Sequence, residues 1–160
     1  MQLYVNLFCR APEAQCAFYA EVLGLPEHTA LRSPIYRALQ GPGFELGFNA
    51  WAAYGLLGLA GRAPSASEAA SSDAQPPATP PVTAYATFML DSCEAVDQAV
   101  RRTVALGGRL IQGPFPTYYG QWQAVLADPE DHVFRVAFAG LPPGVLAPNL
   151  QALTGDSAQE

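Results

Sequence analysis

The hydrophobic and polar positions of this chain follow the same order twice. Residues 2–9 and residues 83–90 are strand candidates, one at the start of each half. A helical pattern follows the first of these strands, with Ala14, Phe18 and Val22 spaced four residues apart. Because proline favours a helix start and glycine a helix end, Pro12 and Gly24 are predicted to bound this helix.

A second helix is predicted after the second strand. Asp91 and Glu94 have the spacing of a capping box, an apolar stripe follows them, and Gly107-Gly108 marks the expected end. Each half then closes with two alternating strands and a turn, the pattern of a β-hairpin. The turns are predicted at residues 41–43 and 128–131. The pattern as a whole predicts an internal repeat of a strand, a helix and two or three further strands.

Strand alternation assigns a face to each side chain of the predicted strands. The bulky apolar faces of the two closing strands are expected to pack on the helices. These faces are formed by Phe44, Leu46, Phe48, Phe134, Val136 and Phe138. Glu45 and Arg135 occupy equivalent positions in the two halves and are expected to point the other way. In the opening strands, Tyr4 aligns with Tyr85 and shares its face with Asn6, and Tyr85 shares its face with Thr87.

A stretch rich in serine, alanine and proline separates the two halves. It carries no periodic apolar pattern, which is typical of a flexible linker or long surface loop. The predicted division is a first module at residues 1–64, the linker at residues 65–82, a second module at residues 83–140 and a C-terminal tail at residues 141–160. A short helical turn is expected near residues 149–153 of the tail.

Composition excludes several classes of protein. The chain has 160 residues and a net charge of −6, and its eight basic residues are all arginines. Scattered arginines in an acidic chain argue against nucleic-acid binding, which needs clustered positive charge. No apolar run is long enough to cross a membrane, and no signal peptide is read at the N-terminus. The three cysteines lack disulfide spacing, so we expect reduced thiols and a cytoplasmic protein.

Two motifs are similar to those of the vicinal oxygen chelate superfamily, which contains glyoxalases, bleomycin resistance proteins and extradiol dioxygenases. The end of the first helix in that superfamily resembles residues 18–24, FYAEVLG, and its last turn and strand resemble residues 128–135, DPEDHVFR. Asp131 stands where glycine is usual in the turn. The resemblance covers residues 2 to about 139 apart from the linker. It implies an α+β fold of two βαβββ modules, with curved mixed sheets around a cavity.

The resemblance also implies where a metal would bind in the metal-dependent relatives. They have one ligand on each opening strand and one on each closing strand. The corresponding positions here are Tyr4, Glu45, Tyr85 and Arg135. Only Glu45 is a good ligand, because a guanidinium is a cation without a lone pair to donate and divalent metals need several His, Cys, Asp or Glu ligands. His28 and His132 fall at none of the four positions, so we expect no metal and no other cofactor.

Glu45 and Arg135 could form an ion pair where the metal would lie, or they could be partly solvated rim residues. In the functional interpretation, Arg135 anchors a carboxylate or polarised carbonyl of a ligand and Glu45 orients it. The aromatic residues near the second hairpin either line this cavity or serve core or dimer packing. The remaining candidate ligand-binding residues are Tyr4, Asn6, Tyr85, Thr87, Tyr119 and Trp122.

Three functions remain open from the sequence. The first is a metal-free protein of the glyoxalase and bleomycin-resistance type that binds a small organic molecule in a cavity between the modules. The second is an enzyme, a lyase, isomerase or dioxygenase, that depends on a metal or uses Glu45 as a base. The third is an interaction protein whose modules dimerise. The resemblance implies a homodimer, and the composition argues against a nucleic-acid or membrane partner.

Overall fold

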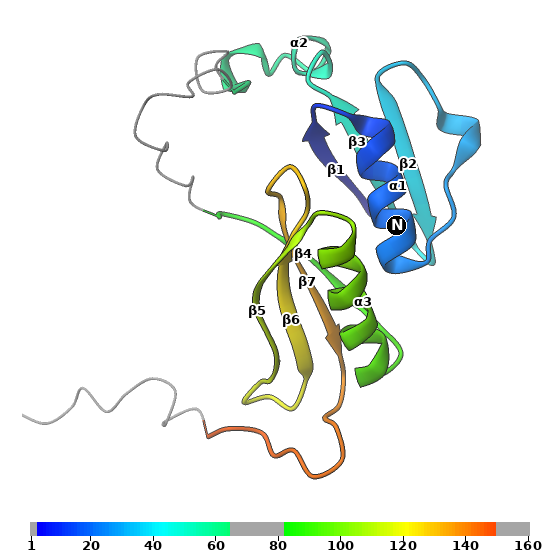
Figure 1. Ribbon diagram of the computed structural model, residues 1–160. Coiled ribbons are helices and arrows are strands. Elements are labelled where there is room, and N and C mark those ends of the chain that lie inside the picture. The colour runs from blue at the N-terminus through cyan, green and yellow to red at the C-terminus, as the bar shows by residue number, and fades with distance from the viewer. Residues whose placement is uncertain (1–2, 65–81, 150–160) are drawn as a thin grey trace, which may run out of the picture. The chain divides into compact units, whose positions relative to one another are not determined.

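The computed structural model describes residues 3–64 and 82–149, and the chain forms two compact units (Figure 1). The first unit consists of residues 1–20 and 24–84, and the second of residues 21–23 and 85–160. Apart from Val82, the predicted linker lies outside the described residues, as does the predicted C-terminal turn apart from Asn149. Among the described residues, no helix has the length and hydrophobicity needed to span a membrane.

The first unit is a mixed sheet with one long helix. Its elements are β1 (Leu3–Cys9), α1 (Pro12–Leu23), a 3-10 turn (Thr29–Leu31), β2 (Tyr36–Gly41), β3 (Phe44–Ala50), α2 (Ala53–Leu56) and a second 3-10 turn (Ala60–Arg62). The strand order is β1-β3-β2, with β1 parallel and β2 antiparallel to β3. A bridge between Glu27 and Leu39 lies where a further strand would extend this sheet.

Helix α1 begins and ends as the sequence predicts. Pro12 is at its first position, where a missing N–H costs nothing. Gly24 ends it in the left-handed conformation, with φ of 68°, and its N–H donates to the Ala20 carbonyl. The helix buries Tyr19 against Phe48 of β3, with ring centroids 5.4 Å apart. The apolar face predicted for β3 therefore packs on α1.

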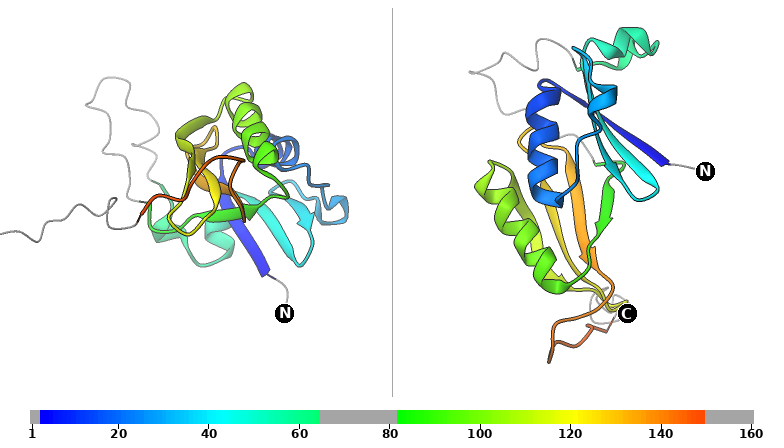
Figure 2. Two further views of the ribbon diagram at one scale, coloured as in Figure 1. Left: turned by 90° about the horizontal axis from the view of Figure 1, so that it is seen from below. Right: turned by 90° about the vertical axis from the view of Figure 1, so that its right-hand side faces the viewer.

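The second unit contains the complete strand set of a βαβββ module. Its elements are β4 (Ala86–Met89), α3 (Cys93–Ala105), β5 (Arg109–Pro116), β6 (Trp122–Ala127) and β7 (Val133–Phe138). The strand order is β4-β7-β6-β5, with β4 parallel to β7 and the other neighbours antiparallel. Figure 2 shows that in each unit the long helix lies across one face of its own sheet. The α+β fold class with two mixed, curved sheets is confirmed.

Two details of the second unit correct the sequence prediction. The first turn of α3 is capped by Ser92, whose hydroxyl accepts a hydrogen bond from the Ala95 N–H at 3.0 Å, so Asp91 is not the cap. A serine one residue later satisfies the same orphan donors. Strand β4 begins at Ala86 rather than Thr83. Tyr85 therefore precedes the strand instead of lying inside it.

Candidate functional site

Glu45 is a buried carboxylate on the side of β3 that faces away from α1. It is only 1% exposed. The Nδ1 atom of His28 lies 3.0 Å from Glu45 Oε2, and the Tyr36 hydroxyl donates to Glu45 Oε1 at 3.2 Å. Both carboxylate oxygens therefore have partners from the same unit, which offsets the cost of burying the group. Glu45 itself presents almost no surface to a molecule in solvent.

Tyr36 links this carboxylate to two asparagines. Its hydroxyl lies 3.4 Å from the Asn6 Oδ1 atom, which also accepts a hydrogen bond from Asn49 Nδ2 at 3.4 Å. Burial, and after it the neighbouring Glu45 carboxylate, raise the pKa of Tyr36 to about 12. The hydroxyl thus stays protonated near neutral pH and acts as a donor. We call these five residues, His28, Glu45, Tyr36, Asn6 and Asn49, the Glu45 network.

Gly47 makes room for the Glu45 network. A β-carbon at this position would clash with both Asn6 Oδ1 and the Tyr36 hydroxyl. The position is buried in the middle of β3, and the Tyr36 hydroxyl can move away from it only by weakening its hydrogen bond to Glu45. The glycine is therefore required by close packing and not by its backbone angles.

Replacing Gly47 with alanine should lower the free energy of unfolding by about 1–3 kcal/mol, the usual cost of overpacking a buried position. Urea unfolding followed by circular dichroism measures the change. Gly55→Ala is the matched control, because a β-carbon there would contact nothing and should cost less than about 0.5 kcal/mol. Equal effects at the two positions would show that the Glu45 network does not need the space above Gly47.

Arg135 occupies the equivalent place in the second unit, on the side of β7 that faces away from α3. Its Nε donates to Thr87 Oγ1 at 3.0 Å, and its Nη1 donates to the Tyr119 hydroxyl at 3.1 Å and to Gln123 Oε1 at 3.2 Å. Its Cζ atom lies 5.6 Å from the ring centroid of Tyr85, within range of a cation–π contact. Among the described residues, Nη2 has no hydrogen-bond partner and no acidic side chain pairs with the guanidinium.

The strand register corrects the alignment of the two opening strands. In the first unit Tyr4 lies beside Glu45, and in the second Thr87 lies beside Arg135. Thr87, rather than Tyr85, is therefore the counterpart of Tyr4. The predicted face is unchanged, because a shift of two residues along a strand keeps the side chain on the same side.

The structure brings most of the predicted site residues together within each unit, but it separates one from the others. Thr87, Tyr85 and Tyr119 contact Arg135, as described above, and Tyr119 also donates to Gln123 at 3.0 Å. Trp122 instead donates from its Nε1 to Asp97 of α3 at 2.9 Å. Trp122 lies on the helix side of its sheet, which corresponds to the core-packing alternative.

Sequence reasoning missed four residues of these clusters: His28, Tyr36, Gln123 and Asn49. Asn49 follows Glu45 by four positions on the same side of β3. His28 comes from the segment between α1 and β2, where no strand pattern assigns it a face. Tyr36 and Gln123 follow the alternation of β2 and β6, which places them on the same sides as Glu45 and Arg135. Alternation was therefore a usable signal for Tyr36 and Gln123, whereas the position of His28 depends on the path of a loop.

The residues at the superfamily's metal positions do not fit a metal. By register these positions hold Tyr4, Glu45, Thr87 and Arg135, of which only Glu45 is a good metal ligand and Arg135 carries a positive charge of its own. In residues 3–64 and 82–149, no three His, Cys, Asp or Glu side chains come close enough together to hold an ion. The predicted Glu45–Arg135 ion pair would connect the two units, and it stays a prediction, as does a cavity between them.

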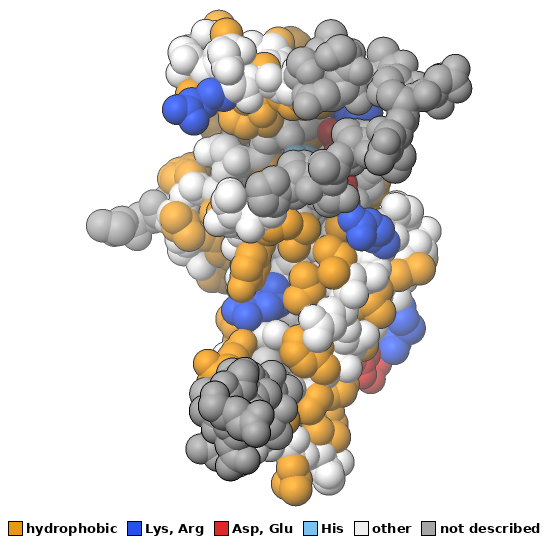
Figure 3. Space-filling view, turned by 90° about the vertical axis from the view of Figure 1, so that its left-hand side faces the viewer, with side chains coloured by type: hydrophobic (Ala, Val, Ile, Leu, Met, Phe, Trp, Pro, Cys, Tyr) orange, Lys and Arg blue, Asp and Glu red, His pale blue; other side chains and the backbone are white. Residues whose placement is uncertain are grey.

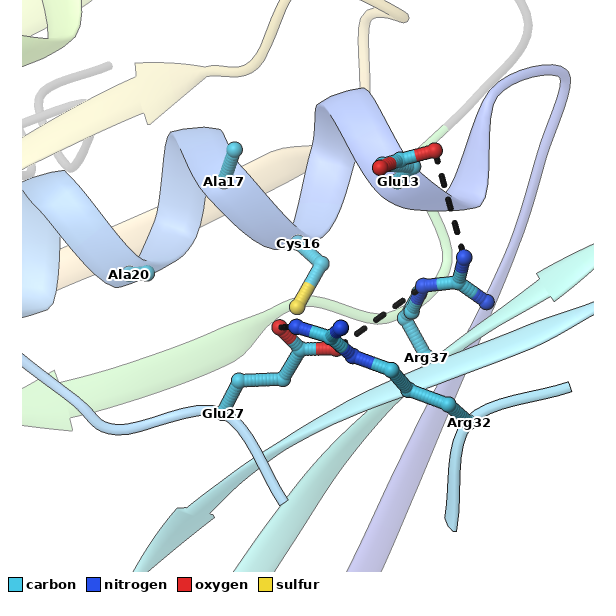
Figure 4. A pocket seen from close by; sticks show the side chains of 7 residues that line it. All are labelled: Glu13, Cys16, Ala17, Ala20, Glu27, Arg32 and Arg37. Atoms are coloured by element: carbon cyan, nitrogen blue, oxygen red, sulfur yellow. Dashed lines mark hydrogen bonds and ion pairs between the residues drawn. The ribbon is translucent and has the colours of Figure 1, made fainter. Parts of the chain in front are cut away.

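A separate small pocket of about 160 Å³ opens beside α1 in the first unit (Figure 4). Its charged groups are already paired: Arg32 donates twice to Glu27, at 2.7 and 2.6 Å, and Arg37 lies 3.9 Å from Glu13. Burial raises the pKa of the Cys16 thiol in this pocket to about 11, which makes it a poor nucleophile at neutral pH. The pocket therefore offers neither a free charge nor a reactive group.

Exposed aromatic and aliphatic side chains accompany the Arg135 cluster. Tyr85, Met89 and Tyr119 of the second unit are each about half exposed. A space-filling view shows hydrophobic side chains reaching the surface over much of one face, with arginines among them (Figure 3). A cation bordered by exposed aromatic rings is a common composition for a small-molecule site.

Comparison with known proteins agrees with this architecture. The family described as "Glyoxalase-like domain" matches residues 2–137. A glyoxalase/bleomycin resistance protein/dioxygenase family enzyme from Burkholderia phytofirmans PsJN is 39% identical, with a TM-score of 0.71, over 85% of this chain and 96% of that one. A glyoxalase-related enzyme from Fulvimarina pelagi is 22% identical, with a TM-score of 0.64, over 86% of this chain and 87% of that one.

A lactoylglutathione lyase from Agrobacterium tumefaciens shares the fold at 20% identity, with a TM-score of 0.53, over 86% of this chain and 92% of that one. No protein with curated annotation matches the sequence. The family match spans most of the chain, and the Burkholderia enzyme is similar over nearly its full length. The chain therefore belongs to the glyoxalase-like family of the vicinal oxygen chelate superfamily.

Proposed function

We propose that this protein binds a small organic molecule that carries a carboxylate, without a metal, and that Arg135 is the anchor. The supporting observation is the unbalanced charge of Arg135. All its hydrogen-bond partners in the described residues are neutral oxygen atoms, and its Nη2 atom makes no hydrogen bond to them. A partly buried guanidinium without an anion is costly, and a carboxylate that accepts from Nη2 relieves this cost through charge-assisted hydrogen bonds.

The surroundings of Arg135 favour an aromatic or other planar carboxylate. The Tyr85 ring lies under the guanidinium, and Tyr119 donates its hydroxyl proton to Gln123. About half of each tyrosine side chain is exposed. A flat apolar body beside the carboxylate would cover these rings and gain the free energy of removing them from water.

Replacing Arg135 with alanine should weaken the binding of benzoate, the simplest aromatic carboxylate, by about ten- to a hundredfold. This corresponds to the roughly 1.5–3 kcal/mol of a hydrogen bond to a charged group. Isothermal titration calorimetry with benzoate measures the effect, and benzamide, which lacks the charge, should bind weakly to both proteins. Arg101→Ala is the control, because it removes an exposed arginine whose partner is Glu94. Equal benzoate affinity of the two variants would refute the proposal.

An enzyme of the glyoxalase or dioxygenase type remains the second candidate function. Its support is the contact between His28 and Glu45, which places an imidazole against a buried carboxylate. Glu45 as a base in direct contact with substrate has less support, because both its oxygens have partners. The expected homodimer and cytoplasmic location remain predictions. Light scattering of the purified protein tests the dimer.

A further inference from the structure

His28 has the setting of a proton acceptor. Its Nδ1 atom lies 3.0 Å from Glu45 Oε2, and its side chain is 32% exposed whereas that of Glu45 is 2% exposed. Its Nε2 atom makes no hydrogen bond to any residue in the described part of the chain. One nitrogen of the imidazole, Nδ1, thus contacts a buried carboxylate, and the other, Nε2, is left without a partner among the described residues.

The hydrogen bonds assign the protons of this pair. The Tyr36 hydroxyl donates to Glu45 Oε1, and the high pKa of Tyr36 keeps that proton in place. A carboxylate can only accept, so His28 Nδ1 carries the proton that it shares with Glu45 Oε2. In the neutral imidazole, Nε2 then holds a free lone pair. An imidazole oriented through Nδ1 in this way is able to act as a general base at Nε2.

We propose that His28, positioned by Glu45, abstracts a proton from a small carbon acid bound on this face of the first unit. The acidic C–H bond lies next to an electron-withdrawing group. The proton moves to Nε2, the electron pair stays on the substrate and is delocalised into that group, and the imidazolium is stabilised through Nδ1 by Glu45. His28 is the catalytic residue, and Glu45 and Tyr36 are positioning residues. This activity does not rest on carboxylate binding at Arg135.

Exposed side chains next to Glu45 offer contacts and a hydrogen-bond donor to such a substrate. Tyr4, beside Glu45 in the register, is 52% exposed. The Asn6 amide is exposed, its Oδ1 accepts from the Glu45 network, and its Nδ2 makes no hydrogen bond to a described residue. An exposed amide N–H is a suitable donor to the oxygen on which negative charge develops.

Base-catalysed opening of nitrobenzisoxazole provides the test. In this reaction the base takes the proton of the ring carbon, that C–H electron pair completes a nitrile, and the N–O bond breaks to leave a coloured phenolate. The chain contains no lysine, so no lysine amine competes with His28 as a base. We expect the wild-type protein to accelerate the reaction over buffer, with a primary isotope effect when the ring carbon carries deuterium.

His28→Gln should lower this rate by about tenfold or more, within the range of general-base catalysis. His132→Gln is the matched control, since His132 Nδ1 also contacts a buried carboxylate, that of Asp128, at 2.9 Å. The control should keep the wild-type rate. Circular dichroism verifies that both variants are folded. A wild-type rate equal to that of buffer, or equal rates for the two variants, would overturn the proposal.

The role of Glu45 has its own readout. Nitrogen NMR at mildly alkaline pH, where free histidine is neutral, should show His28 with its proton on Nδ1. In Glu45→Gln, the amide can donate to Nδ1, so the proton should move towards Nε2 and the rate should fall. A tautomer on Nε2 in the wild-type protein would contradict the assignment, as would an unchanged tautomer and rate in the variant.

Discussion

Replacing Phe48 with alanine should lower the free energy of unfolding by about 3–5 kcal/mol, the usual cost of removing a buried aromatic ring. Phe48 is 0% exposed and lies between β3 and α1, with Tyr19 as a ring neighbour. Its removal leaves a cavity that the sheet cannot close, because the same face is held in register by β1 and β2. Urea unfolding monitored by circular dichroism measures the loss.

Phe44→Ala is the control for this prediction. Phe44 lies on the same side of the same strand but is only partly buried, so its loss should cost clearly less than that of Phe48. The first unit also carries the Glu45 network on the opposite side of β3. Equal losses for Phe44 and Phe48 would mean that α1 does not bury the centre of this strand.

Replacing Asp128 with alanine should lower the free energy of unfolding by about 2–4 kcal/mol, since the change leaves three partly buried donors without their acceptor. Asp128 is 3% exposed. Its Oδ1 accepts from the backbone N–H groups of Glu130 and His132 at 2.9 and 3.0 Å, and its Oδ2 contacts His132 Nδ1. These bonds hold the turn that sets the register of β6 against β7, and therefore the position of Arg135.

Asp131→Gly provides the contrast within the same turn. Asp131 has φ of 71°, a left-handed conformation that glycine adopts without strain, and its carboxylate makes an exposed ion pair with Arg109. Loss of an exposed ion pair costs little stability, so the net change in the free energy of unfolding should stay below about 1 kcal/mol. If Asp131→Gly were as harmful as Asp128→Ala, the stability of the turn would not depend on the buried carboxylate. Urea unfolding of the two variants decides this.

Local sequence signals predicted most of the elements. The bounds of α1 follow from Pro12 and Gly24, and the last turn follows from the Asp128-Pro129 pair. These signals act through the backbone of a few neighbouring residues, so they can be interpreted without knowing how the rest of the chain folds. The α3 cap shows the limit of this reasoning, because Asp91 and Ser92 are both good caps and only the backbone conformation at Ser92 selects one.

The candidate site was predictable only in part. Strand alternation placed Glu45 and Arg135 away from the helices, and the structure agrees for each unit. It could not supply the partners, because His28 is 17 residues from Glu45 and Thr87 is 48 residues from Arg135. The interpretation of Glu45 as a base changes accordingly: the buried carboxylate positions an imidazole that the sequence left in a loop.

The sequence by itself determined the repeated order of strands and helices, the faces of the closing strands, the motifs of the superfamily and the unusual cation at a metal position. Only the tertiary structure decided that Thr87 rather than Tyr85 lies beside Arg135, that Trp122 faces α3, and that His28 meets Glu45. Periodicity and caps depend on residues within a few positions of one another. Register, and the path of a loop across a sheet, are set by packing between residues far apart in the chain, and a one-dimensional pattern does not record that packing.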